Sequence, residues 1–179
     1  MTKKQTTQNK PVIMTIGHST RSFAELVELL HTNGVTMLVD IRTIPKSRFN
    51  PQFNSDTLAE TLPNEGIKYK HMTDLGGLRH AKASSLNTVW QNSSFRGYAD
   101  YMETDPFREA MDKLLQLARK NSVAIMCSEA VWWRCHRSMV ADELVAEGVS
   151  VEHIMGGKHR QLHTLRAFAH VEDGHASYR

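Results

Sequence analysis

Cysteine is scarce in this sequence, and long apolar runs are missing. Only Cys127 and Cys135 occur among 179 residues, which does not suggest a disulfide framework and favours a reducing, cytoplasmic location. No apolar run approaches the roughly 20 residues that span a bilayer, so we expect no membrane partner. Residues 1–11 are polar and basic without the apolar stretch of a secretory signal, and we expect them to form a disordered leader.

Charge of one sign is not in large excess either. The formal net charge is +3, with 22 Lys and Arg against 19 Asp and Glu, and hydrophobic residues make up 40% of the chain. This composition is typical of a globular protein about the size of one domain. A dedicated DNA-binding domain would show a denser basic stripe, so the charge permits an anionic substrate without requiring nucleic acid.

Several chemical fingerprints are absent. The sequence contains no G-x-G-x-x-G, no G-x-x-x-x-G-K-[ST] and no G-x-S-x-G motif. The dinucleotide fingerprint, the P-loop and the nucleophile elbow of serine hydrolases are therefore missing, and we expect no cofactor. Cys127, Cys135 and His136 have a spacing that matches no familiar zinc framework, so no metal site is predicted.

Apolar, β-rich runs alternate with amphipathic segments along the chain. Strands are predicted over residues 12–16, 35–41, 67–71, 122–126 and 149–154, with helical patterns between them. Ser22 and Glu25 form a capping-box pair before the first helix. The pattern predicts a single Rossmann-like α/β domain over residues 12–155, with a mainly parallel sheet of about five strands flanked by helices on both faces. An α+β arrangement with an antiparallel edge is the alternative.

Two segments are predicted to lack regular structure. Residues 80–92 show no clear periodicity and are expected to form a loop that could act as a lid. Residues 156–179 are rich in His, Arg and Lys and poor in apolar residues. This composition predicts a solvated, basic, His-rich tail.

Unusual polar residues follow four of the predicted strands. In open parallel α/β sheets, ligands bind beyond the carboxyl ends of the strands, so we expect an anion-binding pocket at this edge. The residues are His18, Ser19 and Thr20; Asp40, Arg42 and Arg48; Asp74, Gly76, Gly77 and Arg79; and Cys127, Ser128 and Glu129.

Four residues are candidates for catalysis: Glu129, Cys135, His136 and His18. Glu129 follows a buried strand near two tryptophans, where a raised pKa would suit a general acid or base; the alternative is a structural ion pair with an arginine. Cys135 begins the last helix, where the pKa of a thiol falls and the thiolate can act as a nucleophile; the alternative is a packing residue. His18 could donate to a substrate oxygen or anchor its loop, and His136 could assist.

Six further residues are candidates for substrate binding: Ser19, Asp40, Arg42, Arg48, Arg79 and Arg137. Arginines that converge can clamp a phosphate or a carboxylate, although a surface salt bridge is the ordinary role of any single arginine. Asp40 is close enough in sequence to Arg42 to be its local partner.

Four motifs in order resemble a known family. They are Thr15-Ile-Gly-His-Ser-Thr20, Val39-Asp-Ile-Arg42 with Pro45 and Ser47-Arg48, Leu75-Gly-Gly-Leu-Arg79, and Cys127-Ser-Glu129 with Cys135-His-Arg137. In order and spacing they resemble the domain of unknown function 488 (DUF488) family over about residues 12–154. The resemblance implies a compact Rossmann-like domain and supports a shared polar set, but it supplies no reaction. That set is His18, Asp40, Arg42, Arg79, Glu129, Cys135, His136 and Arg137.

The leading hypothesis from these observations is an enzyme that acts on an anionic, nucleotide-like or nucleic-acid-derived substrate by transfer or hydrolysis. One alternative is a non-catalytic module that senses a nucleotide or another anion in the same pocket. Another is a nucleic-acid-binding protein that uses the basic loop at Arg48 and the residues after Gly156. A thiol-based sulfur carrier at Cys135 is the fourth hypothesis.

Overall fold

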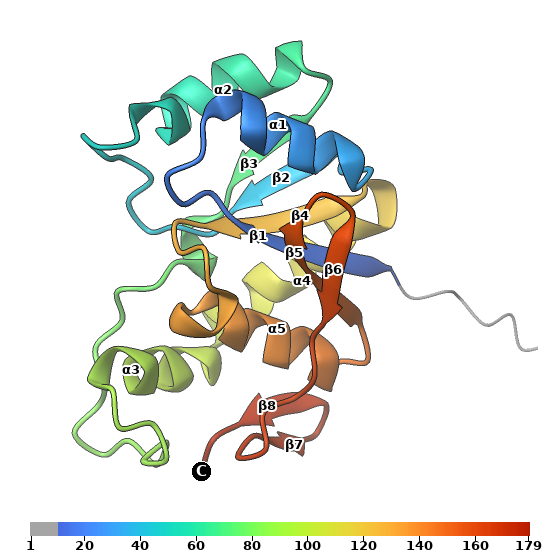
Figure 1. Ribbon diagram of the computed structural model, residues 1–179. Coiled ribbons are helices and arrows are strands. Elements are labelled where there is room, and N and C mark those ends of the chain that lie inside the picture. The colour runs from blue at the N-terminus through green and yellow to red at the C-terminus, as the bar shows by residue number, and fades with distance from the viewer. Residues whose placement is uncertain (1–10) are drawn as a thin grey trace, which may run out of the picture.

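The five strands predicted from the sequence lie in one sheet. The computed structural model of the protein describes residues 11–179, so all but the last residue of the predicted leader lies outside the described residues. The sheet has the order β3-β2-β4-β1-β5-β6, and its first five strands run parallel (Figure 1). The strands are β1 (Val12–Gly17), β2 (Met37–Asp40), β3 (Lys68–His71), β4 (Val123–Cys127), β5 (Ser150–Gly156) and β6 (His159–Leu162).

Helices cover both faces of this sheet, as predicted for a Rossmann-like α/β domain. Helices α1 (Phe23–Thr32) and α2 (Ser55–Asn64) lie on one face, and α3 (Ser93–Met102), α4 (Asp105–Lys120) and α5 (Arg137–Ala146) lie on the other side (Figure 1). Short 3-10 turns lie in the connections at Pro51–Phe53, Thr73–Leu75 and Trp132–Arg134. The α+β alternative retains one correct feature, because β6 is an antiparallel edge strand.

Each face of the sheet has its own hydrophobic core. On one face Leu26 and Leu30 of α1 and Leu58 of α2 are fully buried against the sheet. On the other face Phe107 of α4 and Leu144 of α5 are fully buried. Burial from both sides explains why β4 reads as a continuous apolar run rather than an alternating one.

The start of α1 follows the predicted capping box. The Ser22 side chain accepts a bond from the backbone N–H of Glu25, whose carboxylate accepts one from the backbone N–H of Ser22, at 3.1 and 2.9 Å. These two bonds satisfy donors that the first turn of a helix leaves free. The cap fixes where the chain leaves β1, and it leaves residues 18–22 as a short loop at the carboxyl end of the central strand.

Residues 156–179 do not form a solvated tail, so that expectation was wrong. After β6 the chain forms the hairpin β7 (His170–Glu172) and β8 (His175–Ser177), which packs on α5. Tyr178 is buried, and its hydroxyl donates to Asp142 at 2.7 Å. The backbone N–H of Ala176 donates to the Glu143 carboxylate at 2.8 Å. The segment is poor in apolar residues because it docks on buried acidic groups through hydrogen bonds.

Strands β1 to β4 all end at one edge of the sheet, on the left in Figure 1. The short connection 18–22 and the longer connections 41–54, 72–92 and 128–136 gather there. The stretch 80–92 forms no helix or strand, as predicted. Asp100 anchors it, because its carboxylate accepts bonds from Ser85 Oγ at 2.6 Å and Asn87 Nδ2 at 2.8 Å.

Candidate functional site

The predicted site residues after β1 and β4 meet because Gly17 allows a very close approach. The backbone N–H groups of His18 and Ser19 donate to the carbonyls of Cys127 and Ser128, both at 3.0 Å. A Cβ atom at position 17 would lie 1.7 Å from the backbone oxygen of Glu129. Glycine is therefore required here so that the loop after β4 can lie against the end of β1.

Asp40, Arg42 and His18 form one buried polar group at the ends of β1 and β2. Arg42 donates to both carboxylate oxygens of Asp40, at 2.9 and 2.6 Å, and the Tyr69 hydroxyl donates to the same carboxylate at 2.6 Å. The Arg42 guanidinium also lies 3.2 Å from His18 Nε2. The ion pair with Asp40 therefore confirms the local partnership that the sequence suggested for these two residues.

His18 is held in its neutral form. A guanidinium can only donate, so His18 Nε2 is the acceptor from Arg42, and Nδ1–H donates to the Ser19 carbonyl at 2.8 Å. Burial is the main cause that lowers the pKa of His18, and the charge of Arg42 adds to it. The backbone of Ser19, at φ 50°, lies in the left-handed region. His18 anchors its own loop and orients Arg42.

Two thiols lie in contact where β4 leads into α5. Cys127 Sγ and Cys135 Sγ are 2.9 Å apart, and both residues are buried. The bond from Cys127 lowers the pKa of Cys135 to about 7, with the positive charge of Arg137 acting in the same direction against the effect of burial. Burial raises the pKa of Cys127 well above its ordinary value. Of the two thiols, Cys135 therefore ionises more readily than Cys127.

Arg137, at the start of α5, is a buried cation beside this pair. Its side chain is 1% exposed, and one terminal nitrogen donates to the backbone oxygen of Glu129 at 3.1 Å. Its Nε is buried without a hydrogen-bond partner. Among residues 11–179, the ion pairs involve other arginines and do not include Arg137. A buried guanidinium without a carboxylate is an unusual feature that favours an anion as its partner.

His136 links the end of β2 to the start of α5. Its Nε2–H donates to the carbonyl of Ile41 at 2.8 Å. Burial lowers the pKa of His136 to about 4, so the ring is neutral. A Cβ atom at Gly77 would lie 3.1 Å from His136 Nδ1, so the loop after β3 also packs against this ring. His136 therefore holds together the loops after β2, β3 and β4.

Residues 22–144 match the family model of the domain of unknown function DUF488. The chain belongs to this family. The match covers more than half of the chain, from the cap of α1 into α5, and includes Asp40, Cys127 and Cys135; His18 lies just before it. Neither the curated proteins nor the solved structures contain a match. In residues 11–179 of this DUF488 member, no helix has the length and apolar character needed to cross a membrane.

Three of the predicted residues lie apart from the thiols or use other atoms. Arg48 is exposed in the loop after β2, and Glu129 is exposed and contacts the site through its backbone oxygen. The Arg79 guanidinium lies 3.6 Å from the centre of the Tyr101 ring, and its Nε donates to the Gly76 carbonyl. Their predicted roles remain predictions.

Sequence reasoning missed three residues of the site: Cys127 as the partner of Cys135, Tyr69 and Arg21. The two cysteines flank one strand–loop–helix connection, and that arrangement could have suggested a contact. Tyr69 lies in β3 at a half-buried position of an alternating strand. The Arg21 guanidinium donates to the Gly17 carbonyl, and Arg137 is close enough to lower its pKa, although burial is the larger cause.

A second buried polar cluster lies along the middle of α5. Asp142 accepts a bond from His163 Nε2 at 2.8 Å, His163 Nδ1 lies 2.9 Å from His153 Nε2, and His153 Nδ1 lies 2.6 Å from Thr15 Oγ1. Tyr178 and Arg166 donate to the other oxygen of Asp142, at 2.7 and 3.2 Å. The ring of Trp132 stacks on His153 at 4.3 Å. We call this set the helix-centre cluster.

A possible metal donor set lies away from the thiols, within the described part of the chain. Donor atoms of Glu143, Glu147 and His175 lie within 4.8 Å of one another. The Glu143 carboxylate already accepts bonds from His175 Nδ1 at 2.6 Å and from the backbone N–H of Ala176. Burial, and next the charge of Glu143, raises the pKa of Glu147 to about 7. Internal bonds therefore account for this group.

Proposed function

We propose that this protein is a cysteine-dependent enzyme in which the Cys135 thiolate attacks a sulfur atom of an anionic sulfur compound and Cys127 resolves the intermediate. The observation that carries the proposal is the 2.9 Å contact between the two sulfur atoms. A buried cysteine is ordinarily inert. If both thiols only filled space in the core, burial would raise the pKa of each. Here only Cys127 behaves in that way.

The chemistry proceeds in two displacements. The Cys135 thiolate attacks a donor of the form R–S–X, a new bond forms between Cys135 Sγ and the donor sulfur, and X leaves as a thiolate or sulfite with the electron pair of the broken S–X bond. Cys127 then gives its proton to the departing R–S⁻ group and attacks Cys135 Sγ, which releases R–SH and forms the Cys127–Cys135 disulfide. The donor is reduced by two electrons, and a cellular dithiol returns the protein to its reduced form.

The charges around the thiols support an anionic donor. Arg137 has a buried Nε without a partner beside Cys135, and the N-terminus of α5 adds a favourable field for an anion. Arg42 is already paired with Asp40. Arg137 lowers the pKa of Cys135 through its charge and a hydrogen bond, so Arg137 and the nearby Arg21 are the cations that a donor at Cys135 would meet. A reducing compartment such as the cytoplasm, which we also propose, would keep the dithiol ready to react.

Alkylation and exchange measurements test this function. The rate at which iodoacetamide modifies Cys135 of the folded protein should rise with pH with an apparent pKa of about 7. This reaction should be absent in Cys135→Ser. Thiosulfate and oxidised glutathione are the anionic donors, and uncharged hydroxyethyl disulfide is the matched control. The wild type should form the internal disulfide, whereas Cys127→Ser should accumulate an adduct on Cys135. Modification only above an ordinary thiol pKa of about 8.5, or equal rates with the uncharged donor, would contradict the proposal.

A second candidate function is transfer or hydrolysis on a nucleotide-like anion, with Glu129 as general acid or base. The place of Glu129 beside the buried cation Arg137, which donates to its backbone oxygen, favours it, although the side chain is exposed and not buried as the sequence suggested. A thermal-shift screen of nucleotides against wild type and Glu129→Gln distinguishes the cases, because a ligand of the folded state raises the melting temperature. Binding by both proteins with turnover only by the wild type supports this candidate. Binding by both without turnover supports a sensor instead.

A further inference from the structure

The two edges of the sheet differ sharply in charge. The carboxyl-edge loops, residues 18–22, 41–54, 72–92 and 128–136, hold seven of the chain's 22 Lys and Arg but only two of its 19 Asp and Glu. The turns at the opposite edge, residues 33–36, 65–67, 121–122 and 147–149, hold two glutamates and neither Lys nor Arg. The carboxyl-edge loops therefore carry a net charge of +5 (7 minus 2), mainly because acidic residues are scarce there, and this net charge suits a polyanion.

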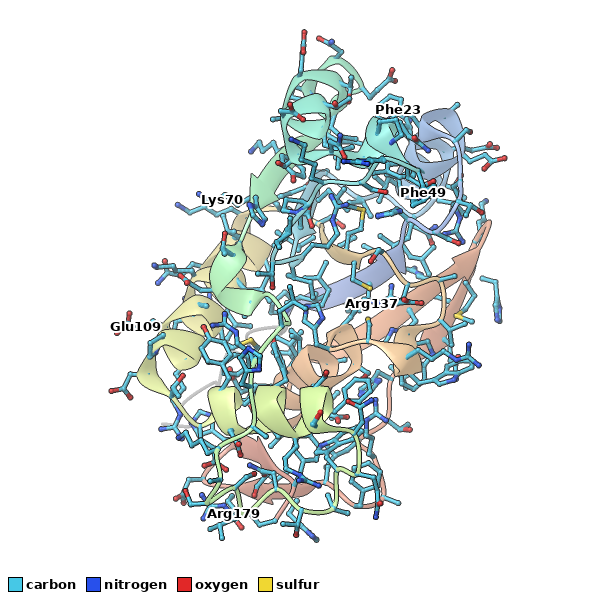
Figure 2. All side chains as sticks on the ribbon, turned by 90° about the vertical axis from the view of Figure 1, so that its left-hand side faces the viewer. Phe23, Phe49, Lys70, Glu109, Arg137 and Arg179 are labelled. Carbon is cyan, nitrogen blue, oxygen red and sulfur yellow. The ribbon has the colours of Figure 1, made fainter. Side chains whose placement is uncertain are left out.

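Large apolar side chains are exposed among these cations. Phe49 is 92% exposed, Leu78 is 73% exposed and Ile44 is 68% exposed, all on the carboxyl-edge loops. Figure 2 looks onto this edge and shows Phe49 on the same side of the molecule as Arg137. An exposed phenylalanine does not stabilise the free protein through burial, so it is a candidate contact for a partner.

Phe49 is presented by an ordered turn. Ser47 Oγ accepts bonds from the backbone N–H groups of Phe49 and Asn50, at 3.1 and 3.3 Å, and Asn54 Oδ1 accepts one from the backbone N–H of Ser47 at 2.7 Å. The side chains of Lys46 and Arg48, on either side of this serine, are exposed. The turn therefore exposes one aromatic ring and two cations within four consecutive residues.

The loop that carries this turn is tied to the thiol site. Thr43 Oγ1 donates to the Gly77 carbonyl at 2.8 Å and joins the loops after β2 and β3. Gln52 donates to the Arg21 carbonyl at 2.9 Å, and Phe53 packs against the ring of His18 at 4.5 Å. A ligand that spans Phe49 would therefore continue along the edge toward Arg21 and Arg137.

We propose that the carboxyl-edge loops bind a single-stranded nucleic acid, with a base stacked on Phe49 and the phosphates paired with Lys46, Arg48 and their neighbours. Stacking on an exposed ring requires a base that is free of its duplex partner, and cations that follow the backbone supply the rest of the affinity. An acidic peptide would use the cations but would leave Phe49 without a role. This inference goes beyond the proposed thiol chemistry, and the binding does not depend on it.

Fluorescence anisotropy with labelled strands of about 12 nucleotides, a length within the usual site sizes, tests the inference. Oligo-dT and oligo-rU are the single strands, and a duplex of the same length and polyglutamate are the competitors. Phe49→Ala should weaken binding of the single strand by about tenfold. Arg48→Gln should weaken all strands alike and lower the salt slope by roughly 0.7. Val171→Ala and Arg119→Gln, at exposed positions of β7 and α4, are the matched controls and should change neither quantity.

Three outcomes would overturn the inference. They are an unchanged affinity in Phe49→Ala, equal or tighter binding of the duplex or polyglutamate, and no binding of any strand at about 50 mM salt. Phe49 is exposed, so its replacement should leave the thermal melting curve intact, and a shifted curve would be checked with Phe49→Trp, which should restore binding. Cys135→Ser should bind the strand like the wild type. Failure of binding with normal alkylation of Cys135 therefore refutes only this inference, and the reverse result refutes only the thiol chemistry.

Discussion

Helix α5 supports two buried polar clusters that differ in how completely their hydrogen bonds are satisfied. In the helix-centre cluster, both oxygens of Asp142 have partners, and both nitrogens of His153 and of His163 are engaged. In the cluster at the start of the helix, Arg137 keeps a buried Nε without a partner, and the pKa of Cys135 is lowered to about 7. The same helix therefore supports one closed network and one open one.

This difference separates a structural role from a functional one. A closed network contributes stability and fixes geometry, because each buried group has the partner it lost from water. An open network costs stability unless a ligand completes it. The helix-centre cluster joins β1, α5 and the segment after β6, and so holds the helix whose first turn carries Cys135 and Arg137. We expect changes in the first cluster to reduce stability and changes in the second to alter reactivity.

The largest expected effect is the loss of the Asp142 charge. Asp142→Asn leaves Arg166 without its carboxylate, and the amide cannot accept bonds at both positions. We expect a loss of about 3–5 kcal/mol in the free energy of unfolding, as for other broken buried pairs. Urea unfolding measures it. Glu152→Gln, which removes a partly exposed pair with Arg160, is the control and should cost less than about 1 kcal/mol. A similar loss in both variants would remove the distinction between closed and surface networks.

Acid should weaken both clusters to a similar extent. Burial lowers the pKa of His136 to about 4 and that of His153 to about 3, below the value of about 6.5 in an unfolded chain. The unfolded state therefore binds the proton first, so this stability is present above pH 6.5 and is lost as the pH falls toward 4 and 3. Between pH 6.5 and 5 each histidine should cost about 2 kcal/mol.

Urea unfolding of wild type, His136→Gln and His153→Gln at pH 7 and pH 5 measures this contribution. Each replacement should reduce the loss of unfolding free energy between pH 7 and pH 5 by the contribution of one histidine, about 2 kcal/mol. This holds whatever the effect of the replacement on stability at pH 7. If His153→Gln alone flattens it, then His136 is protonated in the folded protein at pH 5, and the cluster at the start of α5 is more open to water than its burial suggests.

The fold was predictable because it follows from local patterns. The apolar runs, the capping box of Ser22 and Glu25 and the proline at the start of α4 each have a short-range cause. Residues 156–179 were misjudged because their burial depends on distant partners. Tyr178 and Ala176 are held by Asp142 and Glu143 of α5, and composition alone does not show that a polar segment docks on buried acids.

The candidate site was predictable as a location and less so as chemistry. Parallel strands bring their carboxyl ends together whatever the details, so the sequence could place His18, Arg42 and Cys135 at one edge of the sheet. The contact between Cys127 and Cys135 depends on how the loop after β4 folds back, which in turn depends on Gly17. The sequence could not show that Glu129 would engage Arg137 through its backbone oxygen.

The smallest expected effect in free energy tests the open cluster directly. Arg137→Met keeps much of the buried volume but removes the charge that helps to lower the pKa of Cys135. We expect the alkylation rate of Cys135 at pH 7 to fall about tenfold, equivalent to about 1.4 kcal/mol, with little change in the free energy of unfolding. Arg134→Met, at an exposed neighbouring position, is the control and should change neither. If Arg137→Met instead unfolds as readily as Asp142→Asn while the thiol keeps its rate, Arg137 is structural, and the two clusters do not differ in kind.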